Sequence, residues 1–195
     1  GGKVGVNHAL GKNLIGAFHP PAAVLIDPEL LTPLPRREFR AGLYEVVKYG
    51  MISSHDLFAR VERDLSDLFA RKSRALEPVL ADCCRIKAAI VEADEREAGP
   101  RRALNFGHTI GHAIEAVTKY RRFRHGEAVG YGMLAAADLS ERRRALTSDA
   151  RQSIADLITR MGPLPSVTDL SSKQIVETMK RDKKVVAGKL HFVLP

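Results

Sequence analysis

Tryptophan is absent from this chain of 195 residues, and cysteine occurs only twice. Cys83 and Cys84 are adjacent in a segment with helical rhythm, where neighbouring side chains diverge and a disulfide would be strained. The chain has no run of about 18 apolar residues, the length that a membrane span requires. Its first ten residues also lack the charged-then-apolar profile of a secretory signal. These absences predict a cytoplasmic protein with reduced thiols and no membrane partner.

Positive charge exceeds negative charge, with 31 basic and 23 acidic residues and a net charge of +8. Clustered Lys and Arg would favour a nucleic-acid partner. Here the basic residues are spread along the chain, apart from short groups at 121–124 and 141–145. Few aromatic residues lie among these basic residues, so we expect no nucleic-acid partner. We expect instead a small, strongly anionic substrate.

The composition and the periodicity of the sequence change near residue 35. Residues 1–35 are rich in Gly and Pro, and their one apolar run, residues 22–26, predicts a buried strand. The remainder has helical periodicity, and Gly162-Pro163 marks a helix end. Residues 189–194 predict a short closing strand. The predicted helices span residues 36–51, 56–71, 75–95, 107–120, 125–144, 148–161 and 171–180. We therefore expect a mainly α fold, in which residues 36–195 form a helical domain and residues 1–35 belong to an adjoining α/β domain.

Three histidines lie close together in the sequence, at His108, His112 and His125. On a helix, His108 and His112 are four residues apart on one face, a spacing that lets two imidazoles bind one metal ion. Gly107 and Gly111 leave room for a ligand or for another backbone. The same residues would also suit a core in which the histidines have hydrogen-bond partners, and the spacing leaves both interpretations open.

Three other places carry charged residues that suggest chemistry. Glu45 and Lys48 stand three apart on a predicted helix, where a surface ion pair is the ordinary interpretation. Their apolar surroundings favour a metal ion or a cation as partner for the carboxylate. The Gly-Lys turns at residues 1–3 and 11–13 weakly indicate anion binding but do not match the GxxxxGK[ST] loop. The stretch 87–101 has the composition of a solvated charged turn.

Taken in order, several motifs resemble the second half of the 3-dehydroquinate synthase family over nearly the whole chain. They are GGKVGVNHALGKNLIGAF, EVVKYG, ADERE, RALNFGHTIGHAIEA, HGEAV and RDKK. The resemblance implies a multihelical C-terminal domain that follows an NAD-binding α/β domain, with the active site between them. It implies a lyase that converts 3-deoxy-D-arabino-heptulosonate 7-phosphate to 3-dehydroquinate with release of phosphate, in the shikimate pathway of aromatic amino-acid and chorismate biosynthesis. In that reaction NAD transiently oxidises the C5 hydroxyl, which makes elimination and ring closure feasible.

The resemblance also assigns roles to individual residues. It implies a zinc or alternatively cobalt site on Glu45, His108 and His125, with His112 near the reacting centre instead of on the metal. The residues implied to bind the sugar acid phosphate are Lys3, Asn13, Lys48, Lys87, Arg101, Asn105 and one of Lys183 or Lys184. Those implied in catalysis are His112, Lys48, Glu97, Lys87, Arg101 and Asn105. Those implied to contact NAD are Lys3, Lys12, Leu30, Leu31, Thr32 and Pro33. The family motif RE-x-GLR reads REAGPR here, so that Pro100 could shift Arg101.

Two alternatives remain at this point, another sugar phosphate cyclase of the same superfamily and a non-enzymatic metal-binding helical module. The chain lacks GxGxxG or an equivalent glycine turn, so we expect it to bind NAD weakly and to have no synthase activity alone. Without the missing NAD-binding domain, residues 1–35 would expose strand edges. We therefore expect these residues to be mobile or to pair with another copy, and we expect a homodimer.

Overall fold

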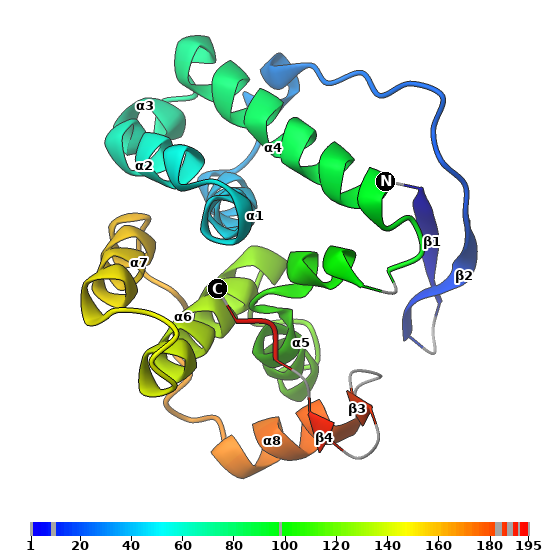
Figure 1. Cartoon of the computed structure of the whole chain (residues 1–195), viewed down its shortest axis with the longest axis vertical. Helices are drawn as coiled ribbons and strands as arrows, with labels where there is room; N and C mark the ends of the chain where they lie inside the picture. The colour runs from blue at the N-terminus through cyan, green and yellow to red at the C-terminus, as the bar shows by residue number, and fades with distance from the viewer. Residues whose placement is uncertain are drawn as a thin grey trace.

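The computed structural model of the chain describes residues 2–8, 11–97, 99–181, 185–186, 189–190 and 192–194. Lys183 and Lys184, two of the predicted substrate residues, lie outside the described residues. Helices make up most of the fold (Figure 1). They are α1 (Arg36–Ser53), α2 (His55–Arg63), α3 (Leu65–Phe69), α4 (Ser73–Ala93), α5 (His108–Val117), α6 (His125–Arg142), α7 (Ser148–Arg160) and α8 (Ser172–Arg181), with the 3-10 turns η1 (Pro28–Leu31) and η2 (Pro100–Asn105).

Most predicted helices are confirmed, with ends that differ by a few residues. The expected helix 56–71 is wrong as one element, because the chain leaves helical geometry at Asp64 (φ −96°, ψ 14°) and divides into α2 and α3. Asp64 accepts two hydrogen bonds from the neighbouring Arg63 guanidinium, at 2.9 and 2.8 Å. The end of α7 at Arg160 agrees with the stop predicted from Gly162-Pro163.

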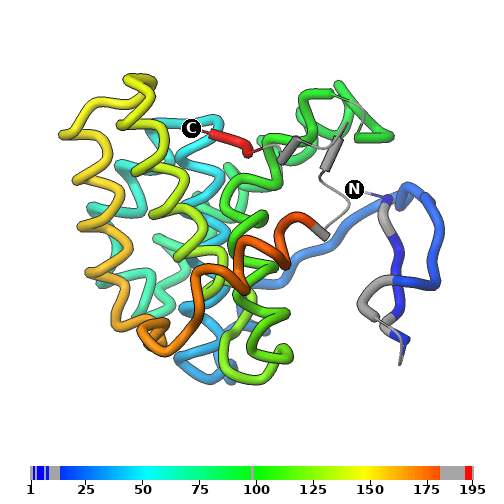
Figure 2. The backbone as a smooth tube through the Cα atoms, turned by 90° about the horizontal axis from the view of Figure 1, so that it is seen from below, coloured from blue at the N-terminus to red at the C-terminus, as the bar shows by residue number. Residues whose placement is uncertain are grey.

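The N-terminal part of the chain forms a hairpin, where the sequence predicted a strand further along. Strands β1 (Lys3–His8) and β2 (Gly11–Phe18) pair antiparallel, with Val6 opposite Ile15. The predicted strand at residues 22–26 is wrong: these residues are irregular, and Leu25 is 97% exposed. A buried strand takes its hydrogen bonds and its burial from neighbouring strands, and no described strand pairs with this segment. Figure 2 shows the hairpin standing to one side of the helical body.

The C-terminal strand pair is small. Strand β3 (Val185–Val186) pairs antiparallel with β4 (Lys189–Leu190), so the predicted closing strand is present in its first two residues. Residues 192–194 are not in a strand. None of the described helices has the length and apolarity needed to cross a membrane. Both cysteines are free thiols, as the sequence predicted.

Helix α1 lies at the centre of the hydrophobic core. Its residues Phe39, Leu43, Tyr44 and Val47 are buried and recur at helical spacing on one face. This face packs with side chains of α2, α6 and α7 in one cluster. The core therefore fixes α1 against α6, the two helices that carry part of the candidate site.

Glycines set how closely the central helices approach. A Cβ added to Gly126 of α6 would lie 1.8 Å from the carbonyl oxygen of Ala41 in α1. A Cβ on Gly132 of α6 would lie 1.8 Å from the carbonyl oxygen of Gly107, the residue before α5. Gly107 has a φ of +75°, a conformation that favours glycine. Gly111 lies against the backbone of Ala128. The space predicted beside Gly107 and Gly111 is thus occupied by another backbone.

Candidate metal centre

Three helices bring one carboxylate and two imidazoles together. Glu45 lies on α1, one turn after Ala41, and α6 begins with His125 directly before Gly126. Because Gly126 touches the backbone of Ala41, His125 is held next to Glu45. Helix α5 begins with His108 and packs along α6, which adds the second imidazole. The close helix contacts therefore also assemble the site.

The distances among these three side chains suit one metal ion. Glu45 Oε1 lies 3.5 Å from His108 Nε2 and 3.6 Å from His125 Nε2. Tetrahedral zinc ligands at about 2.0–2.1 Å from the ion are about 3.3 Å apart. Glu45 Oε1 is also buried without a hydrogen-bond partner, which is unusual for a carboxylate oxygen. A divalent cation between these three atoms would satisfy it.

The other ring nitrogens of the two histidines have their own partners. His108 Nδ1 lies 2.9 Å from the carbonyl oxygen of Phe106, and because a carbonyl only accepts, Nδ1 carries the hydrogen. Burial lowers the pKa of His108 to about 4, so at neutral pH its Nε2 offers a lone pair. His125 Nδ1 lies 3.1 Å from Glu115 Oε2. Both imidazoles thus direct Nε2 toward Glu45.

Lys48 is part of this centre and not of the protein surface. Its Nζ donates to Glu45 Oε2 at 2.5 Å, and its side chain is only 4% exposed. Burial raises the pKa of Glu45, but the charge of Lys48, the imidazole of His108 and the hydrogen bond from Lys48 together lower it below its ordinary value. Glu45 is therefore ionised at neutral pH. The ordinary interpretation of this pair as a surface ion pair does not hold.

His112 lies beside the same centre. Its ring centroid is 5.3 Å from that of His108 and 5.7 Å from that of His125. One nitrogen from each of the three histidines falls within 4.8 Å of the others, so they too form a group that could hold an ion. Only the set with Glu45 uses its buried oxygen, which lies 3.5 and 3.6 Å from the two Nε2 atoms. The geometry thus favours Glu45, His108 and His125 over the HxxxH pair.

A hydrogen-bonded loop leads from α4 to η2 and carries three predicted site residues. Asn105 Nδ2 donates to Glu97 Oε1 at 2.6 Å. The buried Arg101 donates from its guanidinium to the carbonyl oxygen of Glu95 at 2.5 Å. The segment is therefore organised, although its composition suggested a solvated turn.

Asp94, to which the sequence analysis gave no role, organises this loop. Its Oδ2 accepts from the backbone N–H of Gly99 at 2.8 Å and of Arg101 at 3.1 Å. Pro100 is the first residue of η2, a position where its missing N–H costs no helical hydrogen bond. The structure thus accommodates the departure from the family motif locally.

Other predicted site residues are spread more widely. Lys87 lies on α4 and is exposed, and Leu30 to Pro33 lie in or just after η1. Lys3 lies on β1, and Lys12 and Asn13 lie on β2, in the hairpin that stands apart from the helices (Figure 2). The described residues therefore assemble the metal centre and its neighbouring loop but do not gather the predicted NAD contacts around it.

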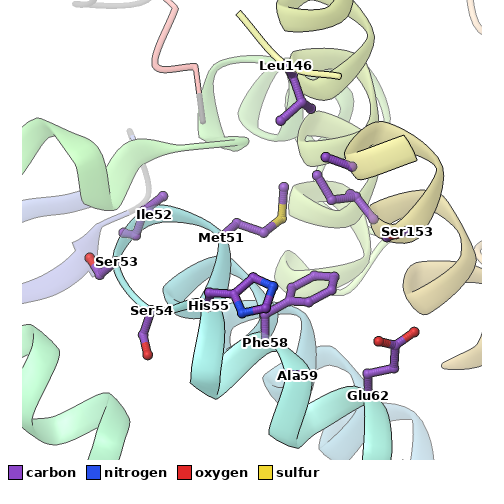
Figure 3. Close-up of a pocket in the computed structure, with 13 residues that line it drawn as sticks. Met51, Ile52, Ser53, Ser54, His55, Phe58, Ala59, Glu62, Leu146 and Ser153 are labelled. Atoms are coloured by element: carbon purple, nitrogen blue, oxygen red, sulfur yellow. The ribbon is translucent and has the colours of Figure 1, made fainter. Parts of the chain in front are cut away.

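A separate cavity of about 570 Å³ contains none of the predicted site residues. It opens between the end of α1, α2 and α7, where Met51, His55, Phe58 and Ile154 contribute to its lining (Figure 3). This cavity is mostly apolar and lies away from the histidine cluster.

Solved structures of two synthases share this fold. The 2-epi-5-epi-valiolone synthase of Streptomyces hygroscopicus subsp. jinggangensis 5008, with NAD+ and Zn2+ bound, has a TM-score of 0.81 and 27% identity, over 92% of this chain and 50% of its own. A 2-deoxy-scyllo-inosose synthase complexed with carbaglucose-6-phosphate, NAD+ and Co2+ has a TM-score of 0.81 and 28% identity, over 99% of this chain and 54% of its own. The fold is thus that of the sugar phosphate cyclase class.

Sequence comparison narrows this class to one family. The profile of the 3-dehydroquinate synthase C-terminal domain matches residues 42–185, and that of the N-terminal domain matches residues 1–41. The 3-dehydroquinate synthases of Solibacter usitatus and Dichelobacter nodosus are 47% and 49% identical over the whole chain. The chain belongs to the 3-dehydroquinate synthase family, as the resemblance predicted. It spans about half the length of these relatives, 55% and 53% respectively.

Proposed function

We propose that this chain supplies the metal- and substrate-binding part of a cytoplasmic 3-dehydroquinate synthase. The whole enzyme would convert 3-deoxy-D-arabino-heptulosonate 7-phosphate to 3-dehydroquinate with release of phosphate, in the shikimate pathway. Relatives of that name at 47% and 49% identity support the assignment. The structural observation that carries it is the buried oxygen of Glu45, which faces Nε2 of both His108 and His125.

Glu45, His108 and His125 are the proposed ligands of one divalent ion, zinc or alternatively cobalt. Carboxylate and imidazole suit both metals, and the solved synthases contain Zn2+ and Co2+ respectively. When bound, the ion supplies Lewis-acid chemistry that favours deprotonation of a substrate hydroxyl and polarises a carbonyl. His112 is the proposed proton-transfer group, because its ring lies beside both ligand histidines without being needed as a ligand.

The cationic side chains are proposed to orient the sugar acid phosphate. A phosphate and a carboxylate held by several charge-assisted hydrogen bonds are fixed in one reactive orientation. Lys48 is already buried at the centre and keeps Glu45 ionised, and Glu97 fixes the amide of Asn105. The residues proposed to complete this site are Lys3, Asn13, Lys87, Arg101 and one of Lys183 or Lys184.

NAD is proposed to bind chiefly to an N-terminal half that this chain does not contain. When bound, it accepts and returns a hydride. Within the chain the proposed contacts are Lys3, Lys12 and residues 30–33, which belong to a remnant of the N-terminal domain at residues 1–35. Residues 36–195 would be the helical domain. Exposed apolar side chains of the hairpin, including Val6 and Phe18, support burial against that half or a second subunit in a homodimer.

The test compares this chain alone with a protein that joins it to an N-terminal half of the family. The joined protein is expected to release phosphate over many turnovers with NAD and zinc, and the isolated chain is expected to bind zinc only. In the joined protein, Lys87→Met should lower turnover strongly without changing zinc content. The matched control Lys173→Met, at an exposed position of α8, should leave both unchanged.

Each outcome distinguishes the proposal from its rivals. Multiple turnovers by the isolated chain would show that the NAD site has been placed in the wrong half. Turnover only with sugar phosphates that lack the carboxylate would indicate another cyclase of the superfamily. Zinc binding by the joined protein without affinity for any sugar phosphate would indicate a non-enzymatic metal-binding module.

A further inference from the structure

Glu115 is a buried carboxylate at the edge of the metal centre that the proposed reaction does not use. It follows His108 by seven residues on α5, about two turns, and so lies on the same face of that helix. Its side chain is 3% exposed, and its Oε2 lies 3.1 Å from Nδ1 of His125. The contact joins α5 to the first residue of α6.

The two imidazoles of the centre are held in different ways. His108 has a side chain that is 11% exposed, and its Nδ1 donates to a backbone carbonyl. His125 is the first residue of its helix, and its side chain is 44% exposed. Packing therefore constrains the ring of His125 much less. A hydrogen bond to a buried side chain is correspondingly more important for its orientation.

We propose that Glu115 is a positioning residue for the metal centre. As a carboxylate it accepts from Nδ1–H of His125, which selects the tautomer whose Nε2 carries a lone pair. The same bond fixes the plane of the ring so that Nε2 points toward Glu45 Oε1. Carboxylate partners of this kind make a ligand imidazole more basic, and removing them lowers metal affinity about 10–100-fold. The inference rests on the metal site of the proposed function.

The experiment measures zinc affinity directly, by competition with a chromogenic chelator, for the wild-type chain and for Glu115→Ala and Glu115→Gln. Glu115→Ala is expected to lower the affinity about 10–100-fold. Glu115→Gln retains an oxygen that can accept from Nδ1–H, so a smaller loss is expected. The visible absorption bands of bound Co2+ should change in Glu115→Ala, because they report the geometry of the ligands.

A variant that is less stable but keeps the metal site intact serves as the control. Leu157 is fully buried in α7, a helix that carries none of the proposed ligands, so Leu157→Ala should lower the melting temperature and leave zinc affinity within about twofold. If both Glu115 variants behave like Leu157→Ala, with unchanged zinc affinity and Co2+ spectrum, Glu115 is only structural and the inference is overturned.

A ligand variant separates this inference from the proposed function. Glu45→Gln is expected to abolish tight zinc binding. If it does so while the Glu115 variants bind zinc normally, only the inference about Glu115 fails. If Glu45→Gln binds zinc as tightly as the wild type, the proposed ligand set is wrong, and the role of Glu115 falls with it.

Discussion

A methyl group at position 126 would test how helix packing sets the geometry of the metal centre. A Cβ on Gly126 would lie 1.8 Å from the carbonyl oxygen of Ala41, whereas real Cβ atoms essentially never come closer than 3.0 Å. Helices α1 and α6 would therefore have to separate by about 1.2 Å, the difference between these distances. Glu45 and His125 flank the contact, so we expect the 3.6 Å between Oε1 and Nε2 to widen by a similar amount.

The magnitude follows from packing and from ligand geometry. Overpacking of this kind costs about 1–3 kcal/mol of unfolding free energy. For a chain of this size each kcal/mol shifts the melting temperature by about 2–4 °C, so Gly126→Ala should lower it by roughly 2–12 °C. Functional sites tolerate displacements of only about 0.5 Å. We therefore expect zinc affinity to fall by at least about tenfold.

Gly42, which lies next to Ala41 on α1, provides the matched control. A Cβ at Gly42 meets nothing within 4 Å, so Gly42→Ala should raise the unfolding free energy by about 0.5–1 kcal/mol and leave zinc affinity unchanged. Thermal melts followed by circular dichroism and zinc titrations measure both quantities. Wild-type stability and zinc affinity in Gly126→Ala would refute the close contact. An equal loss of zinc affinity in Gly42→Ala would show that the metal site does not depend on the contact between Gly126 and Ala41.

Three further outcomes are expected. Burial raises the pKa of Glu127, but hydrogen bonds from Arg37 and from the backbone lower it below its ordinary value, so the ionised form stabilises the fold above about pH 4.3. Because its partner Arg37 is partly exposed, Glu127→Gln should lower the unfolding free energy by only about 1–3 kcal/mol at pH 7. The difference in stability between this variant and the wild type should shrink as the pH falls through the folded-state pKa of Glu127. Zinc at 100 times its dissociation constant should stabilise the chelator-treated chain by about 2.7 kcal/mol, an effect that Glu45→Gln removes and His112→Gln retains. Thr147→Ala removes the side-chain cap of α7 and should cost about 0.5–2 kcal/mol without altering zinc affinity.

The helices were predictable because their signal is local. Apolar residues recur at helical spacing in α1 and α6, and the turn at Gly162 ends α7 as expected. The failures depend on longer-range contacts. Residues 22–26 have the composition of a buried strand but no strand beside them among the described residues, so their side chains face solvent. Composition indicates which conformation a segment favours, whereas its burial depends on which neighbouring segments are present.

The site shows the same division between local and tertiary information. The spacing of His108 and His112 predicted a cluster of imidazoles, which the structure shows together with His125, and the family resemblance was needed to suggest Glu45 and His125 as ligands. The apolar residues around Glu45 and Lys48 argued against an ordinary surface pair, and Lys48 is indeed buried, but nothing in the sequence indicated that Glu115 reaches across to His125. The seven-residue interval from His108 to Glu115 would have placed both on one helix face. Only the packing of α5 on α6 shows what that face contacts.

The proposed metal and NAD sites should be separable for a structural reason. All three proposed metal ligands, and the glycine contacts that hold their helices together, lie within the helical part of this chain. The proposed NAD contacts lie in the first 35 residues, where the described residues of the hairpin and residues 22–26 expose apolar side chains. A site built from helix crossings forms with the helical core, because the same contacts stabilise both. A site on segments that lack neighbours forms only when those neighbours are supplied, so zinc binding should precede and outlast NAD binding whenever the two halves are assembled or taken apart.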